Sequence, residues 1–396
     1  MLLIGRATGL VRDSVLSAKF GLTQQGDAAA ILLSLPDLLT ALLVSGGMSA
    51  ALVPRLTKLS PTEQASLVRF AMIAIGGTFA ILGLLFIFVP RAFFGILAPG
   101  NEALGSQVGT LAALAIGFAL PLSALAGISG AWLNARGAFG LAGAGTLIVN
   151  LVIVLTMLFW RDTNTLITGL ALGILAAASI RLVSQLAALP IASVFRHRVL
   201  AEGRRAILSD FAIGVSTVFL SLLPPVILRA AASFLPEGTL AATYYSQKLI
   251  ELPVGVILSA IGTIALTEMS TRHAESGQGA ADAATKHMRR ALQLAIVAAT
   301  AGAFFCAPAV DLVFGYGQME PDDRRLVASL FGIGVCALPF TALVAIGANY
   351  LYATGQPRKS VMPTLVACFA TPLFSLPALI LQRPELIMVA FLAAQT

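Results

Sequence analysis

The chain has 396 residues, of which 58% are hydrophobic and only 11% are charged. Soluble domains carry about a quarter charged residues, so this composition excludes a soluble globular protein. The apolar residues are spread along the whole length, which also excludes a soluble domain with one membrane anchor. A net charge of +7 would suit a nucleic-acid binder, but the basic residues are not clustered, and cytoplasmic loops of membrane proteins carry the same excess.

Apolar runs of about 20 residues predict a polytopic, all-α membrane protein with eleven complete spans and an incomplete twelfth. The expected spans lie at about 1–20, 28–53, 68–90, 106–133, 140–160, 165–192, 208–235, 240–269, 290–315, 324–352, 360–381 and from 385 onward. Each boundary is expected to hold within a few residues. Because residues 1 and 396 both fall inside or at the edge of an expected helix, we expect that the sequence is a fragment or that its start is misassigned.

These spans predict two transmembrane lobes of six helices each, at residues 1–192 and 208–396, with the last helix incomplete. Between them, residues 193–207 (SVFRHRVLAEGRRAI) are polar, basic and amphipathic. Such a segment is typical of a linker on an anionic membrane surface.

Lysine and arginine in the expected loops predict the orientation of the chain. One set of alternate loops holds fourteen of these residues and the other set holds six. Because cytoplasmic loops carry the excess of positive charge, the first set and the N-terminus are expected in the cytoplasm.

One stretch of sequence occurs twice. ALPLSALAGISGAWLNARG (119–137) and ALPFTALVAIGANYLYATG (337–355) are identical at nine of nineteen positions, 218 residues apart (337 minus 119). Leu35-Pro36 and Leu252-Pro253 form a weaker pair, 217 residues apart (252 minus 35). Six expected helices separate the members of each pair, so the copies share one orientation. This pattern predicts a parallel repeat, with pseudosymmetric lobes around a central cleft.

Four prolines of these repeated helices are candidate hinges. A proline inside a helix removes one backbone hydrogen bond and allows a bend. The candidates are Pro36, Pro121, Pro253 and Pro339.

Several charged residues lie inside expected spans, where each is costly unless it faces water or a partner. They gather in spans 1, 2, 7 and 8, and they are Arg6, Arg12, Asp13, Asp37, Arg229, Lys248 and Glu251. Four others, Arg181, Asp210, Glu268 and Asp311, lie nearer to span ends, where they are expected to reach water. The first group predicts a polar cavity, and its excess of cations predicts an anionic substrate such as a phosphate.

The sequence offers little support for an enzyme. His197, His273 and His287 lie in polar connections, and the three cysteines stand singly in apolar segments. No metal-ligand cluster, nucleophile motif or phosphate-binding loop is visible. We therefore expect no enzymatic activity, no cofactor and no metal site.

Four segments resemble the MurJ/MviN family of lipid II flippases, within the multidrug/oligosaccharidyl-lipid/polysaccharide exporter superfamily. They are GRATGLVRDSVLSAKFG with LPDLLTALLVSGGMSAALVPRL, then FLPEGTLAATYYSQKLIELPVGVILSAIGTIALTEMS, and LYATGQPRKSVMPTL. The resemblance covers almost the whole chain, and the segment from Tyr244 to Val256 is its most specific part. It implies alternating access by two six-helix lobes, usually followed by two further helices, which we expect to be absent from residues 1–396.

The resemblance also implies roles for individual residues. The cavity arginines of the family fall on Arg6 and Arg12, and its acidic residues fall on Asp13, Asp27 and Glu251. Thr40 and Ser45 stand where the family usually has an arginine and a glutamate, and Lys248 replaces an arginine. Arg229 is not part of the pattern, and we expect it to replace part of the lost charge.

Together these observations predict a lipid II flippase of the bacterial inner membrane. Arg6, Arg12, Lys248 and Arg229 are expected to bind the pyrophosphate. Asp13, Asp27, Asp37 and Glu251 are expected to couple transport to the membrane potential or to a monovalent cation. The alternatives are a flippase for another lipid-linked polysaccharide unit and a non-transporting scaffold that recruits cell-wall synthesis enzymes. A cation-coupled drug exporter is disfavoured because the charge excess inside the spans is basic.

Overall fold

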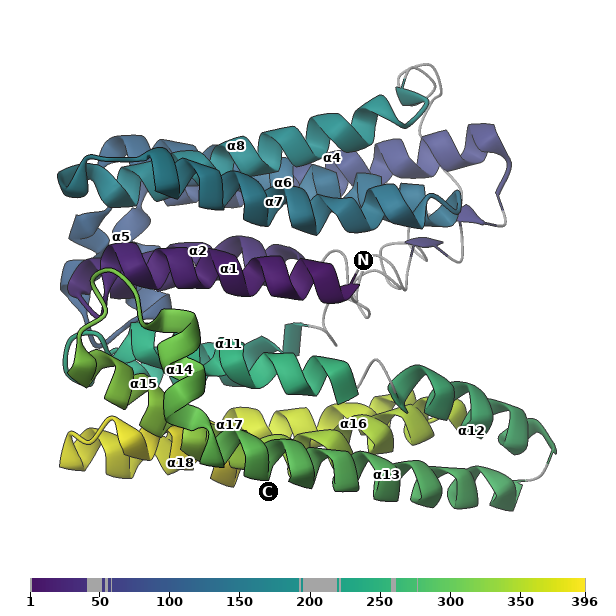
Figure 1. Ribbon diagram of the computed structural model, residues 1–396. Helices are drawn as coiled ribbons and strands as arrows, with labels where there is room; N and C mark the ends of the chain where they lie inside the picture. The colour runs from purple at the N-terminus through teal and green to yellow at the C-terminus, as the bar shows by residue number, and fades with distance from the viewer. Residues whose placement is uncertain are drawn as a thin grey trace. The chain divides into compact units, whose positions relative to one another are not determined.

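The computed structural model describes residues 2–40, 52–53, 56–57, 59–191, 194, 219–220, 222–257, 261–275 and 277–395. Every regular element within these ranges is a helix (Figure 1). The chain divides into two compact units. The first comprises Met1–Lys19, Gln24–Ile96 and Asn101–Leu222, and the second comprises Phe20–Thr23, Leu97–Gly100 and Leu223–Thr396. Apart from residue 194, the predicted linker lies outside the described residues, so its position and the lobe boundaries stay predictions.

The labelled helices up to residue 187 follow the expected spans closely. They are α1 (Leu2–Phe20), α2 (Gln24–Thr40), α4 (Pro61–Phe88), α5 (Pro90–Leu97), η2 (Glu102–Gln107), α6 (Thr110–Ala135), α7 (Phe139–Phe159), η3 (Thr163–Thr165) and α8 (Leu166–Ala187). Helices α4, α6, α7 and α8 run side by side, with α6 between α4 and α8 (Figure 1).

The helices after residue 221 begin with the short apolar helix Leu222–Ala232. The labelled ones are α11 (Thr239–Ile257), α12 (Thr263–Glu275), α13 (Gly277–Phe304), α14 (Cys306–Phe314), α15 (Pro321–Gly334), η5 (Val335–Ala337), α16 (Leu338–Ala353), η6 (Pro357–Ser360), α17 (Val361–Leu381) and α18 (Glu385–Gln395). Helices α12 and α13 form a hairpin that packs on α16, and α17 packs on α18 (Figure 1).

Six helices of the described chain are long and apolar enough to cross a membrane. They are Pro61–Phe88, Thr110–Ala135, Phe139–Phe159, Thr163–Ala187, Pro321–Ala353 and Val361–Leu381. The prediction of a polytopic, all-α membrane protein is confirmed. Helices α1, α2 and α11 are not among the six. They correspond to predicted spans 1, 2 and 8, the helices in which the sequence concentrates its intramembrane charges.

Two predicted spans are interrupted within the described residues. The span at 290–315 is the pair α13 and α14, which bend by 73° at Phe305. Pro308 lies in the first turn of α14 and cannot donate a hydrogen bond to the carbonyl of Phe304. The span at 324–352 contains the 3₁₀ turn η5. The predicted span at 240–269 corresponds to α11 and the polar helix α12, and residues 258–260 between them lie outside the described residues.

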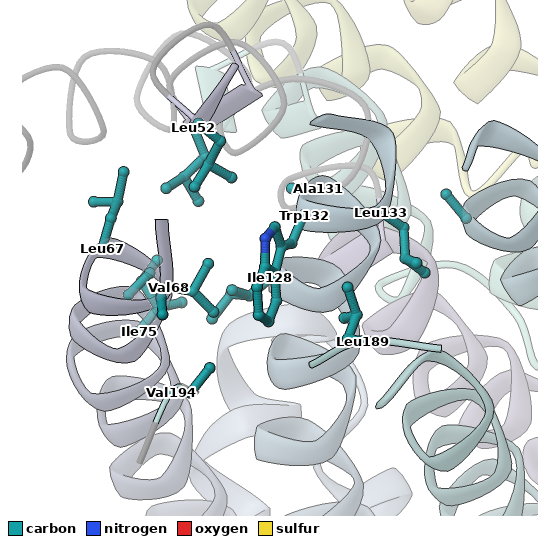
Figure 2. Close-up of a cluster of buried hydrophobic side chains, with 14 of the residues drawn as sticks. Leu52, Leu67, Val68, Ile75, Ile128, Ala131, Trp132, Leu133, Leu189 and Val194 are labelled. Carbon is teal, nitrogen blue, oxygen red and sulfur yellow. The ribbon is translucent and has the colours of Figure 1, made fainter. Parts of the chain in front are cut away.

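The first unit holds a core of buried side chains between α4 and α6, with Trp132 inside it (Figure 2). Trp132 is 1% exposed, and its indole nitrogen donates to Gln64 Oε1 at 3.4 Å. Gln64 in turn donates to the carbonyls of Leu56 and Leu59, at 2.8 and 3.2 Å. One amide side chain therefore ties the segment before α4 to both core helices.

Small residues allow α4 and α6 to approach closely. A Cβ atom added at Gly83 would lie 2.1 Å from the carbonyl oxygen of Gly117, and one added at Gly117 would lie 2.7 Å from that of Gly83. The Gly117 carbonyl has no helical donor because residue 121 is a proline. The two glycine backbones thus pack where the Pro121 break leaves a free acceptor, as small-residue interfaces in membranes do.

The duplicated sequence ends in the same local structure in both copies. Gly137 and Gly355 follow the ends of α6 and α16 with φ of 77° and 72°, values that glycine adopts without strain. The amides of Ala138 and Gln356 donate to carbonyls five residues earlier, at 2.9 and 2.8 Å. Both copies therefore end in a Schellman motif. The pseudosymmetry of the whole lobes stays a prediction.

Candidate functional site

The predicted substrate-binding cations fall on both units. Arg6 and Arg12 lie on α1 of the first unit, whereas Lys248 lies on α11 and Arg229 on the helix Leu222–Ala232 of the second unit. Each unit therefore has its own cluster.

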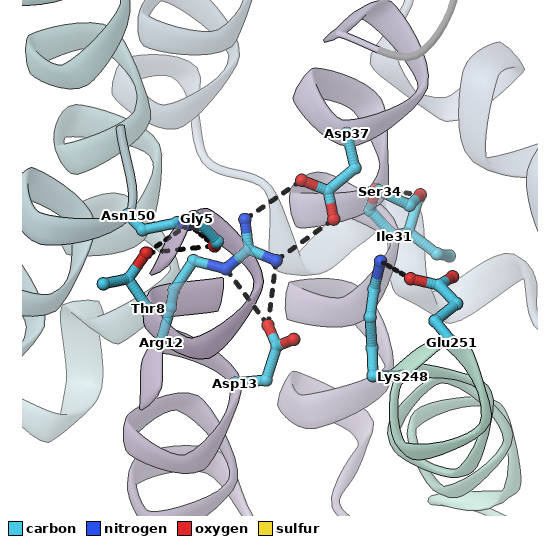
Figure 3. Close-up of polar contacts among 10 residues, drawn as sticks. All are labelled: Gly5, Thr8, Arg12, Asp13, Ile31, Ser34, Asp37, Asn150, Lys248 and Glu251. Carbon is cyan, nitrogen blue, oxygen red and sulfur yellow. Dashed lines mark hydrogen bonds and ion pairs between the residues drawn. The ribbon is translucent and has the colours of Figure 1, made fainter. Parts of the chain in front are cut away.

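The cluster of the first unit is an ion triad between α1 and α2 (Figure 3). Arg12 Nε and Nη2 donate to Asp13 Oδ1 at 3.0 and 2.9 Å. The other edge of the guanidinium forms a bidentate pair with Asp37, in which Nη1 donates to Oδ1 at 3.0 Å and Nη2 donates to Oδ2 at 3.1 Å. Arg12 thus joins two helices through two carboxylates.

The triad is buried unevenly. The side chains of Arg12 and Asp13 are 4% and 2% exposed, whereas that of Asp37 is 30% exposed. With both carboxylates ionised, the three groups carry a net charge of −1. Buried charges of this kind persist when each is paired and hydrogen-bonded, because removing one partner leaves an uncompensated charge.

Arg6 lies on the same helix, and its surroundings differ from those of Arg12. Its Nη1 atom is buried and has no hydrogen-bond partner among the described residues. On either side of Arg6 in the sequence, Asn150 of α7 donates to the Gly5 carbonyl at 3.1 Å and to Thr8 Oγ1 at 3.2 Å (Figure 3). These bonds fix α1 against α7 beside Arg6. Arg6 is therefore a cation that keeps one buried donor atom without a partner among the described residues.

Two further sequence-predicted residues lie elsewhere in the first unit. Asp27 is 3% exposed and lies in the first turn of α2, where the helix dipole favours a negative charge. Thr40, which stands in place of the arginine of the family, is the last residue of α2. Ser45 lies outside the described residues.

The cluster of the second unit is more exposed. Lys248 Nζ lies 3.1 Å from Glu251 Oε2, three residues further along α11, and the two side chains are 19% and 63% exposed (Figure 3). The ring of Tyr244, one turn before Lys248, lies 5.5 Å from Lys248 Nζ and 5.8 Å from Arg229 Cζ. Arg229 Nε also donates to the Pro225 carbonyl at 3.1 Å. A buried aromatic ring therefore contacts both predicted cations of this unit.

The four candidate hinge prolines occupy different positions in their helices. Pro121 and Pro253 lie inside α6 and α11, and Pro36 falls within the bounds of α2. Pro339 lies instead in the first turn of α16, directly after the 3₁₀ turn η5. Its copy of the repeat thus contains a break in the α-helix where the other copy is continuous.

Sequence reasoning missed two features. Arg181 was expected to reach water, but it is 3% exposed and packs with Gln185 against Gly145 of α7. That expectation is wrong because α6 and α7 cover this end of α8. Tyr244 was also missed as a contact of both cations, although its spacing of four residues from Lys248 placed the two on one helix face.

No group of three or more His, Cys, Asp and Glu residues that could hold a metal is present in the described part of the chain.

Helices of this kind define a polytopic, all-α membrane protein. The structure matches that of “Lipid II flippase MurJ, inward closed conformation” with a TM-score of 0.85 and 18% identity, covering 99% of this chain and 83% of the other. It also matches the inward-facing conformation of a multidrug resistance transporter of the MATE family, in the MOP superfamily. There the TM-score is 0.78 and the identity 14%, over 98% of this chain and 91% of the other. At these identities the matches establish the fold.

Sequence comparison establishes the family. The family model described as “Lipid II flippase MurJ” matches residues 16–396. The chain is 25% identical to a probable lipid II flippase MurJ of Thermotoga maritima, covering 91% of this chain and 74% of that protein. It is 26% identical to its Vibrio cholerae counterpart, covering 93% and 73%. This chain belongs to the MurJ family, so the resemblance found in the sequence is confirmed.

Proposed function

We propose that this chain moves lipid II, the undecaprenyl-pyrophosphate-linked precursor of peptidoglycan, across the bacterial inner membrane by alternating access. The observation that carries the proposal is the family match over residues 16–396. The relatives bear the names of transporters and not of enzymes.

The charged clusters support an anionic head group as the ligand. Arg6 and Arg12 of the first unit, and Arg229 and Lys248 of the second, are the proposed contacts for the pyrophosphate. Guanidinium and ammonium groups both bind phosphate oxygens through charge-assisted hydrogen bonds. The polyprenyl tail stays in lipid while the head group crosses.

The orientation and the energy source belong to the same proposal. We place the N-terminus in the cytoplasm because positive residues are concentrated in one set of loops. Asp13, Asp27, Asp37 and Glu251 are the proposed coupling groups, through which the membrane potential or a monovalent cation drives the cycle. Reporter fusions to alternate loops test the orientation, and inversion of the reporter pattern would contradict it.

Complementation tests the function. A bacterium depleted of its own lipid II flippase should regain growth when this chain is expressed. The Arg12→Ala variant should fail to restore growth, and Glu102→Gln should succeed, because Glu102 is an exposed carboxylate that belongs to neither cluster. Membrane levels of each variant are measured by immunoblot.

Two results would redirect the proposal. Failure to rescue, together with rescue of a polysaccharide-export mutant, would assign another lipid-linked saccharide as the substrate. Failure of both, together with co-purification of cell-wall synthesis enzymes, would assign a scaffold role.

A further inference from the structure

The hydrogen bonds of Arg12 raise a difficulty for a residue that should bind a diphosphate. A guanidinium has five N–H donors. Four of those of Arg12 are directed at carboxylates, two at Asp13 and two at Asp37. A phosphate is held most strongly by two parallel N–H donors from one edge of the guanidinium. In this arrangement the ligand can reach such an edge only if one carboxylate leaves.

The two carboxylates differ in how easily they can leave. Asp13 is the neighbour of Arg12 on the same helix, and its side chain is 2% exposed. Asp37 comes from another helix, holds the outer edge of the guanidinium through Nη1 and Nη2, and is 30% exposed. Asp37 is therefore the displaceable partner.

The backbone beside Asp37 is also suited to movement. Residue 36 is a proline, so the carbonyl of Leu32 lacks its helical donor. One residue earlier, the Ile31 carbonyl accepts a hydrogen bond from Ser34 Oγ at 2.7 Å (Figure 3). The regular backbone bonding of α2 is thus interrupted directly before the residue that bridges to α1. Helices bend most readily at such interruptions.

We propose that Asp37 competes with the diphosphate for the outer edge of Arg12, so that binding of the head group releases the end of α2 from α1. This inference rests on the proposed function, in which Arg12 binds the diphosphate. It makes Asp37 a specificity-determining residue, because a ligand must attract Arg12 more strongly than a carboxylate does. Inorganic pyrophosphate carries more negative charge than inorganic phosphate and should displace Asp37 more effectively.

Binding of inorganic pyrophosphate to the purified chain, measured by calorimetry, tests the proposal. Asp37→Asn should bind pyrophosphate about tenfold more tightly than the unsubstituted protein, the range expected for charge-assisted hydrogen bonds. The preference for pyrophosphate over inorganic phosphate should fall at the same time. Asp37→Glu should restore both the affinity for pyrophosphate and the preference for pyrophosphate over phosphate, because it restores the competing carboxylate.

Glu102→Gln is the matched control, since it removes one exposed carboxylate from the same unit without touching Arg12. It should bind both anions like the unsubstituted protein. Loss of structure in a variant weakens binding, so an increase in affinity confined to Asp37→Asn has no merely structural explanation. An increase of equal size in Glu102→Gln would overturn the proposal, because it would show a general effect of charge.

Arg12→Ala separates this inference from the proposed function. If Arg12→Ala abolishes binding and Asp37→Asn leaves it unchanged or weaker, the competition is overturned while the role of Arg12 stands. If both variants bind like the unsubstituted protein, Arg12 does not contact the diphosphate, and the competition and that part of the proposed function are both overturned.

Discussion

The two charged clusters hold their cations in different ways. In the first unit, Arg12 is buried and held by two carboxylates, so its position is fixed by four hydrogen bonds. In the second unit, Lys248 pairs with a largely exposed Glu251 and rests against the ring of Tyr244. Removing one member of a buried triad is costly because it leaves an uncompensated charge, and a ligand reaches the cation of the triad only by competing with a carboxylate. An exposed pair contributes little to stability but leaves its cation accessible.

Replacement of the buried cation should have the largest effect. Arg12→Ala removes the partner of a carboxylate that is 1% exposed, so we expect the free energy of unfolding to fall by about 3–5 kcal/mol. Lys248→Ala, the equivalent change in the second unit, should cost less than about 1 kcal/mol. Denaturant unfolding in detergent micelles measures both. Equal losses in the free energy of unfolding would show that burial does not distinguish the two clusters.

The aromatic contact in the second unit should have an intermediate effect. Tyr244→Leu removes the ring that lies 5.5 Å from Lys248 and 5.8 Å from Arg229, and each contact contributes about 0.5–2 kcal/mol. Tyr244→Phe keeps the ring and should retain most of the affinity for inorganic pyrophosphate, whereas Tyr244→Leu should lose it by about tenfold. The same calorimetry measures both variants. A loss in Tyr244→Phe as large as in Tyr244→Leu would show that the hydroxyl matters and the ring does not.

Removal of the exposed carboxylate should affect stability least among the substitutions. Glu251→Gln breaks a pair whose acid is 63% exposed, so the free energy of unfolding should change by less than about 1 kcal/mol. If Glu251 couples transport to an ion, flipping of lipid II in proteoliposomes should nevertheless slow. Unfolding and flipping measured on one preparation separate the two effects. A large fall in the free energy of unfolding would contradict this prediction and show that Glu251, like the carboxylates of the triad, has a structural role.

A third acidic site, on α12, provides a pH-dependent comparison. Hydrogen bonds from His287 and then Lys286 lower the pKa of Glu268 from its usual 4.5 to about 2, and Arg272 adds a charge contribution. Because the pKa is lower in the folded state, the stabilising contribution is present above pH 4.5 and is lost as the pH falls towards 2.

The unfolding temperature of the protein should therefore fall between pH 4.5 and pH 2 more steeply than that of Glu268→Gln. The effect should be small because Glu268 is accessible to water. Parallel curves for the two proteins would contradict the assigned pKa.

Much of the architecture followed from the sequence because it depends on local composition. Long apolar runs predicted α7 and α17 nearly to the residue, and α4, α6 and α8 within about seven residues at each end, since a span must be apolar over about 20 residues. The repeated sequence also predicted matched helix ends, and Gly137 and Gly355 share one conformation. Residues expected to line a cavity occurred on helices that are not among the six long apolar helices of the described chain.

The pairing of charges between helices was not predictable from spacing. Lys248 and Glu251, three residues apart on one helix, do pair at 3.1 Å. In the first unit, Asp13 accepts hydrogen bonds from its neighbour Arg12. The approach of α2 brings Asp37 to the far edge of the same guanidinium. Arg181 likewise looked free to reach water until α6 and α7 covered it.

The sequence by itself therefore determined the class of protein, the positions of most helices, the family and the residue types of the charged clusters. Each of these depends on composition, periodicity or a local motif. Only the tertiary structure decided which carboxylate neutralises which cation and which cation keeps a buried donor without a partner among the described residues. Those facts depend on contacts between helices distant in sequence, such as Arg12 of α1 with Asp37 of α2, and no local pattern contains that information.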